Sequence, residues 1–384
     1  MRVGCNLLWL VPGVVGGTEL ATVSLLRELA AEPADGIEPV LYALDEFGRR
    51  YPDLVEAFPT RSVPLTGRLR PLRVAAENTW LARQARDDDV VHHMGGVLPP
   101  AHRGRSVVTV HDLQPFDMPE NFAPSKRLYL QQAIPWSVRR ADVVVAPSQF
   151  VRQGIVDRFG VDPARVMLAP WGVEPPSTDV SVAEVQARYR LPRRWFVYPS
   201  FTWWHKGHGL LVRAFAQLAA REDDLVLVLT GGRGPADQAV DDAIAELGLT
   251  HRVRRTGLVP RRDVLAIMRG AVALTFPSRY EGFGLPVLEA MSLGTPVLAA
   301  DSAALPEIVG SGGRIVPGGD ADAWVAAMSE MLADEAARER LVAAGRERVA
   351  KFTWAATAAD TVAAYRAAAR AAGPGAGDDT GAPT

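Results

Sequence analysis

Cysteine is almost absent from this chain, which has only Cys5 among its 384 residues. A single thiol cannot form an internal disulfide or build a thiolate metal site by itself. A disulfide-stabilised secreted domain is therefore excluded, and the composition predicts a cytoplasmic protein. Cys5 lies in the apolar run Val3–Leu10, so we expect it to be a buried strand thiol.

Long apolar runs and an excess of one charge are also missing. No run reaches the roughly 18 apolar residues that a membrane span needs, and the segment after Arg2 lacks the basic start and small-residue cleavage site of an export signal. Lys and Arg total 42 and Asp and Glu total 44, which gives a formal net charge of −2. This balance gives no reason to expect nucleic acid as the main partner.

Motifs for metals and dinucleotides are missing too. Asp87–Asp89 precedes an apolar run and is interpreted as a solvated loop, and His92, His93 and His102 show no spacing typical of metal ligands. We therefore expect no essential metal and no cofactor. No Gly-x-Gly-x-x-Gly follows the first predicted strand, which counts against a dinucleotide-dependent oxidoreductase.

Short apolar runs alternate with helical patterns along the whole chain. Val107–Val110 and Val143–Val145 show no apolar–polar alternation, which is typical of strands covered on both faces. This alternation predicts an α/β fold with two doubly wound parallel sheets. The predicted strands are 2–9, 39–44, 90–94, 106–111, 142–147, 165–169, 195–199, 225–230, 252–256, 271–276, 295–299 and 313–316. The predicted helices are 18–31, capped by Thr18, and 207–220, 236–247, 261–269, 286–293, 303–309, 320–333 and 335–350.

The Pro- and Ser-bearing stretch 172–192 is the predicted junction between two domains. It gives a first domain at 1–175 and a second at 190–353, followed by an Ala-rich helix at 354–372. Residues 373–384 contain no large apolar side chain and are expected to be disordered. Open parallel sheets bind ligands beyond the carboxyl ends of their strands, so functional residues are expected in the loops that follow strands.

The most informative of these loops is Glu281–Met291. Gly282 and Gly284 let the backbone approach a ligand closely, and Pro286 suits the first turn of a helix. The N–H groups near 283–286 would point outward with the helix dipole behind them. This arrangement favours a bound phosphate.

Glu281 and Glu289 stand eight residues apart in this segment. A loop carboxylate can accept hydrogen bonds from sugar hydroxyls, although a glutamate near a helix start is also favoured by the dipole alone. With the lead-in Phe276–Tyr280, the pair resembles the Glu-x7-Glu motif of retaining GT-B glycosyltransferases, specifically glycosyltransferase family 4. The resemblance runs from the Gly16-Gly17 loop to Trp354. It implies a GT-B fold, with two Rossmann-like domains facing a cleft and a C-terminal helix that crosses back to the first domain.

The resemblance also implies a role for each matching residue. Glu281 and the backbone of 282–285 would hold the donor sugar and its diphosphate, and Glu289 would hold the ribose. His111, at a strand end, would contact the transferred sugar. The implied donor-binding residues are Gly16, Gly17, Lys206, Thr256, Gly257, Leu258, Glu281, Gly282, Phe283, Gly284, Leu285 and Glu289. The implied catalytic residues are His111, Lys206 and Glu281.

Lys206 also has a reason of its own to bind an anion. A lysine at a helix start opposes the helix dipole unless an anion offsets it, and a diphosphate would do so. Lys206 resembles the family's diphosphate-binding lysine. The arginine that many members carry five or six residues earlier is replaced here by Phe201 or Ser200. This departure puts a two-cation clamp in doubt unless His205 or another arginine compensates.

One cluster of charge stays open to two interpretations. Arg61, Arg68, Arg70 and Arg73 are interpreted as a solvated basic face. The alternative is that they contact an anionic partner. This partner would be either the inner face of a membrane, weakly bound, or an acidic acceptor.

Together these patterns predict a retaining, metal-independent glycosyltransferase. It would move a hexose from a nucleoside diphosphate sugar, GDP-mannose first or else a UDP-hexose, to a hydroxyl of a glycan, lipid-linked or small-molecule acceptor. Three alternatives remain: a nucleotide-sugar 2-epimerase of the same fold, a dinucleotide-dependent oxidoreductase, and a non-catalytic binding protein.

Overall fold

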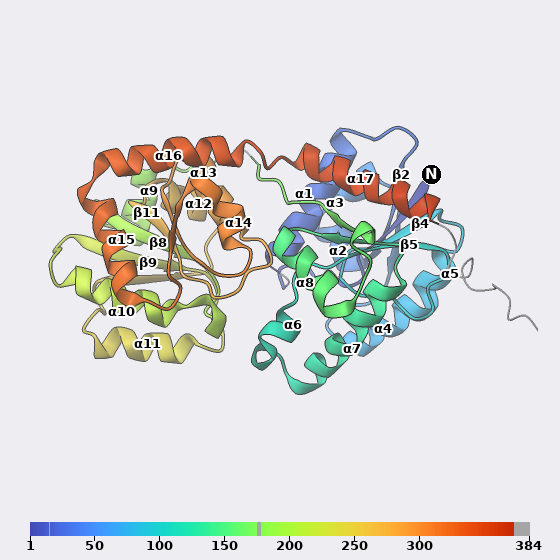
Figure 1. Ribbon diagram of the computed structural model, residues 1–384, viewed down its shortest axis with the longest axis horizontal. Helices are drawn as coiled ribbons and strands as arrows, with labels where there is room; N and C mark the ends of the chain where they lie inside the picture. The colour runs from blue at the N-terminus through green and yellow to red at the C-terminus, as the bar shows by residue number, and fades with distance from the viewer. Residues whose placement is uncertain (15, 175–177, 372–384) are drawn as a thin grey trace, which may run out of the picture.

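The computed structural model describes residues 1–14, 16–174 and 178–371. They form two α/β domains that lie side by side (Figure 1). The first domain contains a seven-stranded sheet in the order β3-β2-β1-β4-β5-β6-β7, and the second a six-stranded sheet in the order β10-β9-β8-β11-β12-β13. Neighbouring strands pair in parallel in both sheets. The prediction of two doubly wound parallel sheets is confirmed.

The first sheet follows the predicted strands with one addition. Its strands are β1 (Arg2–Asn6), β2 (Glu38–Leu44), β3 (Thr60–Val63), β4 (Val90–His93), β5 (Arg105–Thr109), β6 (Val143–Ala146) and β7 (Val166–Leu168). The edge strand β3 was not predicted, because three of its four side chains are not buried and its sequence carries no apolar run. Cys5 in β1 is buried as predicted, and burial raises the pKa of its thiol to about 12.

The helices of the first domain were largely missed. They are α1 (Gly17–Ala31), α2 (Asp45–Arg50), α3 (Pro52–Ala57), α4 (Arg70–Ala76), α5 (Ala82–Gln84), α6 (Gln114–Asp117), α7 (Pro124–Arg140) and α8 (Gln149–Phe159). Only α1 was predicted, and Thr18 does not cap it. The helix begins one residue earlier, and its N-cap is Gly16, whose positive φ of 66° suits glycine.

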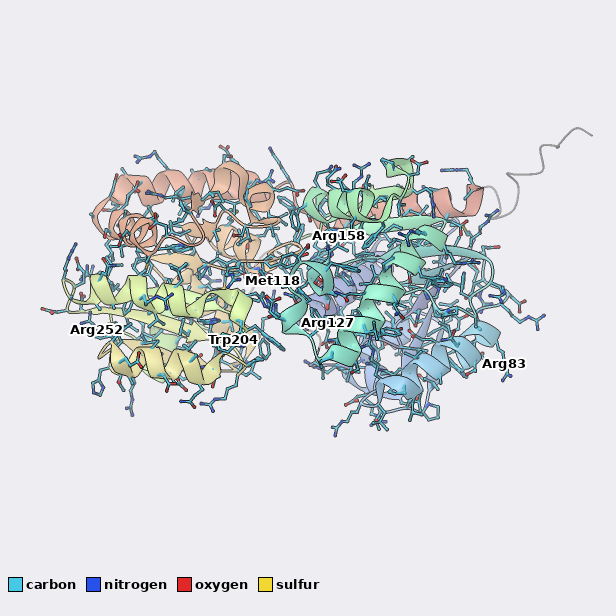
Figure 2. The ribbon with its side chains drawn as sticks, turned by 60° about the horizontal axis from the view of Figure 1, so that its bottom comes forward. Arg83, Met118, Arg127, Arg158, Trp204 and Arg252 are labelled. Carbon is cyan, nitrogen blue, oxygen red and sulfur yellow. The ribbon has the colours of Figure 1, made fainter. Side chains whose placement is uncertain are left out.

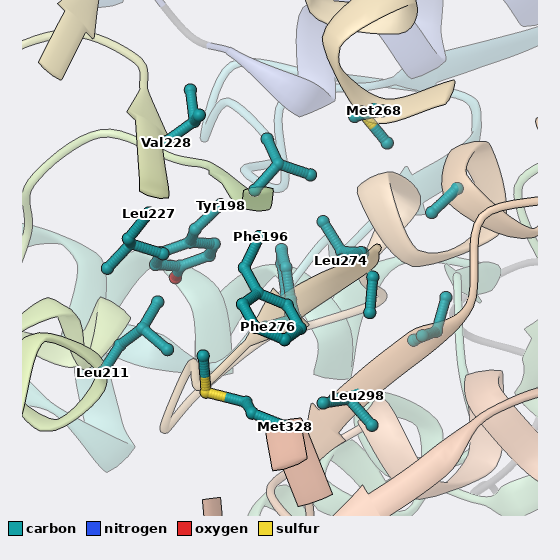
Figure 3. Packing of buried hydrophobic residues seen from close by; sticks show 14 of the residues in the cluster. Phe196, Tyr198, Leu211, Leu227, Val228, Met268, Leu274, Phe276, Leu298 and Met328 are labelled. Carbon is teal, nitrogen blue, oxygen red and sulfur yellow. The ribbon is translucent and has the colours of Figure 1, made fainter. Parts of the chain in front are cut away.

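The second domain matches its predicted elements closely. Its strands are β8 (Arg194–Pro199), β9 (Leu225–Thr230), β10 (Val253–Gly257), β11 (Ala273–Phe276), β12 (Val297–Ala300) and β13 (Arg314–Val316). Its helices are α9 (Val182–Tyr189), α10 (His208–Ala219), α11 (Asp237–Glu246), α12 (Arg261–Arg269), α13 (Leu285–Ser292), α14 (Leu305–Val309), α15 (Ala321–Ala333) and α16 (Glu335–Val349). Long side chains from several of these elements fill its core, including Phe196, Phe276, Leu298 and Met328 (Figure 3).

Helix α9 lies inside the stretch predicted as a junction. It begins with a capping box formed by Ser181 and Glu184, and Val185 is fully buried in the core of the second domain. Val182, Val185 and Tyr189 form an apolar face toward this core, but the helix has only eight residues and its pattern was not recognised within the Pro- and Ser-bearing stretch. Residues 175–177 of the predicted junction lie outside the described residues.

The last described helix, α17 (Trp354–Arg370), crosses back to the first domain as predicted (Figure 1). It packs against α1 and the strands β4 to β7. Trp354 and Tyr365 belong to the core of the first domain, and the Tyr365 hydroxyl lies 2.9 Å from Nδ1 of His92. His92 therefore has a structural partner. The predicted tail at 373–384 lies outside the described residues.

The acidic run Asp87–Asp89 is only partly solvated. Asp87 is exposed, but the Asp88 carboxylate is fully buried, 2.7 Å from Nε of Arg2, and accepts a hydrogen bond from the Tyr42 hydroxyl. The prediction of a solvated loop is therefore wrong for Asp88, because a basic residue at the start of β1 lies beside it. None of the described helices is long and apolar enough to cross a membrane.

Candidate active site

Loops at the carboxyl ends of the two sheets meet where the domains face each other. The Ser148 hydroxyl, at the start of α8, donates a 2.7 Å hydrogen bond to the carbonyl oxygen of Gly282. The Tyr280 hydroxyl accepts one of 3.0 Å from the N–H of Leu113. Figure 2 shows Met118 of the first domain near the boundary with the second. The Ser148–Gly282 and Leu113–Tyr280 hydrogen bonds join the loop before α13 directly to the first domain.

Glu307 of the second domain makes a further link. Its carboxylate accepts hydrogen bonds from the N–H groups of Gln149 (2.8 Å) and Phe150 (3.0 Å), the first two residues of α8. A carboxylate at a helix start satisfies N–H groups that have no partner within the helix and interacts favourably with the dipole. The two domains are therefore held in register on one side of the site.

Lys206 and Glu281 form an ion pair in this region. The Lys206 ammonium lies 2.6 Å from Oε1 of Glu281, and both side chains are largely buried. Lys206 ends a short turn after β8, and its carbonyl oxygen accepts a hydrogen bond from the buried Tyr198 hydroxyl. Glu281 follows β11. Two residues that the sequence singled out independently are thus neighbours in space.

The loop before α13 is pressed against the end of β5. A side chain at Gly282 would overlap the carbonyl oxygen of His111 and approach Cβ of Asp112 to 2.9 Å, so only glycine fits there. Gly284 is the N-cap of α13 with a φ of 109°. Phe283 is buried, and its ring lies 5.1 Å from that of Trp171. The structure therefore brings the loop, His111 and the Lys206–Glu281 pair together.

His111 is held as a neutral imidazole. Its Nε2 lies 2.7 Å from the carbonyl oxygen of Met94, and since a carbonyl only accepts, the proton is on Nε2. Burial lowers the pKa of His111 to about 4. The rings of Trp9 and Trp171 flank it at 5.7 and 5.8 Å. Nδ1 is buried, with no hydrogen-bond partner in the described part of the chain.

Asp112 is a site residue that was not predicted from the sequence. Burial is the main reason that its pKa is raised, and nearby Glu281 adds to the effect. The N–H of Gln114, Lys206 and Lys126 act in the opposite direction, and Oδ1 accepts from that N–H at 2.9 Å. Asp112 therefore lies between charged groups of both domains. Its position directly after His111 at a strand end was the available signal.

Glu289 has a partner that the sequence reasoning missed. Its carboxylate is buried within α13 and lies 2.8 Å from a guanidinium nitrogen of Arg261. Arg261 is the first residue of α12, where a cation opposes the helix dipole. Arg261, like Lys206, is a cation at a helix start, and that position was the available signal.

Two of the predicted donor-binding residues border a separate cavity of about 360 Å³. Thr256 and Gly257 line it, while the Leu258 side chain is 73% exposed. Phe201, one of the two residues in place of the expected arginine, covers Gly232 beside it. Arg255 also lines the cavity and is paired with Asp237 and Asp241.

His205 does not supply the missing cation. Its Nδ1 lies 3.1 Å from the amide nitrogen of Asn121 in the first domain. Burial, followed by the nearby charges of Lys206 and Arg279, lowers its pKa to about 3. The imidazole is therefore neutral near pH 7 in this structure, which does not favour His205 as the cation that compensates for the missing arginine.

The first domain has a larger cavity, of about 610 Å³, beside His111. Val14 and Thr18, on either side of the Gly16-Gly17 turn, contribute to its lining. An added Cβ at Gly16 or Gly17 would meet no atom within 4 Å, so this turn borders open space. The turn is near the cavity rather than packed against the Lys206–Glu281 pair.

Arg70 and Arg73 also line this cavity, whereas Arg61 and Arg68 are exposed. The interpretation of the four arginines as one solvated basic face is therefore wrong for Arg70 and Arg73, because α4 turns both side chains inward. In the described ranges, no group of three or more His, Cys, Asp or Glu side chains is arranged to hold a metal ion.

Two facing parallel α/β domains, with strand-end loops meeting between them and a C-terminal helix returning to the first, define a GT-B glycosyltransferase. Residues 192–348 match the family model described as "Glycosyl transferases group 1", and residues 15–176 match "Glycosyltransferase Family 4". The chain belongs to this family of glycosyltransferases.

Known relatives and structures agree with this assignment. The chain is 29% identical to the O-antigen chain mannosyltransferase B of Escherichia coli, over 83% of this chain and 82% of that protein. It is 32% identical to the D-inositol 3-phosphate glycosyltransferase of Kineococcus radiotolerans, over 75% and 68%. Anabaena Alr3699/HepE, solved with UDP and glucose, has the same fold with a TM-score of 0.74 at 18% identity, covering 94% and 98%.

Proposed function

We propose that this glycosyltransferase moves a hexose from a nucleoside diphosphate sugar to a hydroxyl acceptor, with retention of the anomeric configuration. The observation that carries the proposal is the Lys206–Glu281 ion pair, 2.6 Å long, beside the glycine loop at the start of α13. It joins a cation suited to a diphosphate and a carboxylate suited to sugar hydroxyls at one point. The same point faces His111 of the first domain.

Donor binding would exchange partners within this pair. The ammonium of Lys206 would turn to the diphosphate, and the Glu281 carboxylate would then accept hydrogen bonds from the sugar. As the bond between sugar and diphosphate breaks, negative charge grows on the leaving oxygen. Lys206 and the N–H groups at 283–286 would stabilise that charge, and fixed donors of this kind account for much of enzymatic rate enhancement.

Retention is proposed to follow a same-face displacement. The acceptor hydroxyl would attack the anomeric carbon from the side that the diphosphate leaves, and a donor phosphate oxygen would take the hydroxyl proton. His111 supports this route as a positioning group, because its backbone carbonyl lies against Gly282 of the donor loop and its imidazole is neutral. The reaction needs no protein nucleophile and no metal ion.

GDP-mannose is the first choice of donor and a UDP-hexose the second. The name of the E. coli relative supports mannose, and the HepE complex supports a UDP-linked hexose. Among the acceptors, the relatives' names include a glycan chain and inositol 3-phosphate. A location in the cytoplasm, which the single cysteine favours, remains part of the proposal.

A nucleotide-release assay across GDP-, UDP- and dTDP-sugars, with and without a panel of hydroxyl acceptors, tests the proposal. We expect release to rise when an acceptor is added, and the product to keep the anomeric configuration of the donor by its NMR coupling constant. An inverted product would reject the mechanism. Release of nucleotide with an altered free sugar, independent of any acceptor, would instead indicate a 2-epimerase.

A further inference from the structure

The 610 Å³ cavity of the first domain contains more positive charge than its walls neutralise. All of its lining residues come from the segment 6–134. Three of them are cations, namely Arg70 and Arg73 on α4 and Lys126 on α7. The two helices lie far apart in sequence, so the fold rather than a local charge run gathers these groups.

None of the three cations has a carboxylate partner among the described residues. The Arg70 guanidinium lies over the ring of Tyr129, 4.2 Å from its centroid, and the Lys126 ammonium lies 5.2 Å from the Phe122 centroid. Arg73 donates to the carbonyl oxygen of Trp9 at 2.7 Å, and its buried Nε has no partner. Aromatic faces and a carbonyl orient cations without cancelling their charge.

The two acidic side chains in the cavity lining, Glu77 and Asp112, form no ion pair with the three cations and offset their charge only in part. Glu77 accepts a 3.0 Å hydrogen bond from the Asn6 amide, and burial raises its pKa. The Asp112 carboxylate accepts from the N–H of Gln114. Burial lowers the pKa of Lys126, the positive charges of Arg70 and Arg73 lower it further, and Asp112 acts in the opposite direction. Such a cluster is stabilised when an anion binds.

The position of the cavity relates this charge to the reaction. His111 and Asp112 belong to its lining, and the same two residues lie against Gly282 of the second domain. A molecule in the cavity therefore ends at the point where the donor sugar is expected. The cavity falls within the range of about 300–1,000 Å³ that small-molecule sites occupy.

We propose that this cavity binds an acceptor carrying a phosphate group, with Arg70, Arg73 and Lys126 holding the phosphate and the acceptor hydroxyl lying at His111. The inference rests on the proposed function and adds the chemical class of the acceptor. Two guanidiniums and an ammonium suit a phosphate better than a carboxylate, because a phosphate monoester carries up to two charges and three strongly accepting oxygens. The donor diphosphate has its own cation at Lys206, on the other domain.

Direct binding tests this inference without requiring turnover. Isothermal titration would compare glucose 6-phosphate, glucose 1-phosphate, mannose 6-phosphate and inositol 1-phosphate, each with its unphosphorylated parent. A short polyprenyl diphosphate-linked sugar in detergent micelles would form a second arm. We expect at least one phosphorylated probe to bind at least about tenfold more tightly than its parent, as charged hydrogen bonds predict. If the sugar phosphates bind more tightly, the acceptor carries a free phosphate. If the lipid-linked sugar binds more tightly, the phosphate belongs to a lipid carrier.

Substitutions in the lining test whether the cavity causes the preference for phosphorylated probes. Arg70→Gln and Lys126→Gln should each weaken phosphate binding about tenfold or more, while binding of the unphosphorylated parent changes little. Arg68→Gln is the matched control, because Arg68 is exposed near the same helix and does not line the cavity. Melting curves would establish that each variant folds.

Two results would overturn the inference. One is that no probe in either arm binds more tightly than its unphosphorylated parent. The other is that Arg70→Gln weakens phosphate binding no more than Arg68→Gln. Failure of the nucleotide-release assay with every donor would instead count against the proposed function, since phosphate binding is measured without a donor.

Discussion

In the second domain, Lys206 lies 2.6 Å from Glu281, and Arg261 lies 2.8 Å from Glu289. In the cavity of the first domain, by contrast, Arg70, Arg73 and Lys126 have no described carboxylate partner, and an aromatic ring or a carbonyl group orients each of them. The cations of the second domain are therefore in ion pairs, whereas those in the cavity of the first domain are not.

This difference indicates how each half would respond to its ligand. An ion pair must open before its members contact a donor, so binding in the second domain exchanges one set of charge contacts for another. A cation cluster without ion pairs gains its first direct ionic contact when an anion binds. Within this cluster the buried Nε of Arg73 has no hydrogen-bond partner among the described residues, which is costly, and a bound anion would remove that cost.

The largest expected effect is on turnover when Lys206 is removed. Lys206→Ala should lower the rate by about 10²–10³, because a charged stabiliser of the leaving diphosphate is lost. Lys206→Arg should recover only part of the rate, since a planar guanidinium does not replace a compact ammonium. Steady-state kinetics with the best donor would measure both changes.

Lys351→Ala is the matched control, because Lys351 is exposed between α16 and α17. Its rate and the melting temperatures of all three variants should stay close to those of the unmodified protein. Near-normal turnover of Lys206→Ala would place the cation for the leaving group elsewhere, with the exposed Arg279 as the next candidate.

Acid should destabilise both domains through buried neutral histidines. Burial lowers the pKa of His92 and His205 to about 3 and of His111 and His208 to about 4. An unfolded histidine titrates near 6.5, so between about 6.5 and 4 the unfolded chain binds more protons than the folded one. Stability therefore falls as the pH drops through this window, by up to about 1.4 kcal/mol per pH unit for each imidazole.

Melting curves from pH 7 to pH 4 would measure this loss. His251 is the matched control site, because it is an exposed histidine for which no such burial applies. His251→Asn should leave the acid sensitivity unchanged, whereas His208→Asn should reduce it if the variant folds. A melting temperature independent of pH across this range would contradict the neutral state of the four imidazoles.

A smaller effect is expected from Glu289. If its carboxylate accepts hydrogen bonds from the donor ribose, Glu289→Gln should raise the donor KM about tenfold with a smaller change in kcat, because ground state and transition state lose the contact equally. Glu339→Gln, at an exposed carboxylate on α16, is the control. A fall in kcat with an unchanged KM would assign Glu289 to the chemical step instead.

No effect at all is expected from removing metal ions. The diphosphate charge is proposed to be met by Lys206 and the N–H groups at 283–286, so initial rates in EDTA should equal those in its absence. A strict requirement for added Mg²⁺ or Mn²⁺ would refute the proposal that Lys206 and these N–H groups stabilise the diphosphate without a metal ion.

The second domain was the more predictable half of the fold. Its strands and helices follow one another with short loops, and apolar runs such as Leu225–Thr230 appear in the sequence as uninterrupted blocks. In the first domain, α7 contains Pro135, and several other helices span only three to seven residues. Such segments carry no long periodic pattern, so tertiary packing rather than local sequence determines whether they are helical.

The site shows the same limit. A sequence motif could single out Lys206 and Glu281 separately, but only the fold shows that they are paired. The inward turn of Arg70 could not be read from a run of arginines, because it depends on α7 lying opposite and on the ring of Tyr129 beneath the guanidinium. Charge in a sequence gives the number of cations, whereas their environment comes from contacts between distant segments.

The central claim is that the second domain binds the donor and the first binds an anionic acceptor. Titration of Lys206→Ala and Arg70→Gln with GDP or UDP, and separately with the best-binding sugar phosphate, tests it most directly. The account predicts that Lys206→Ala loses affinity mainly for the nucleotide and Arg70→Gln mainly for the sugar phosphate. If both variants lost affinity equally for the nucleotide and for the sugar phosphate, this assignment of donor and acceptor to separate domains would be contradicted.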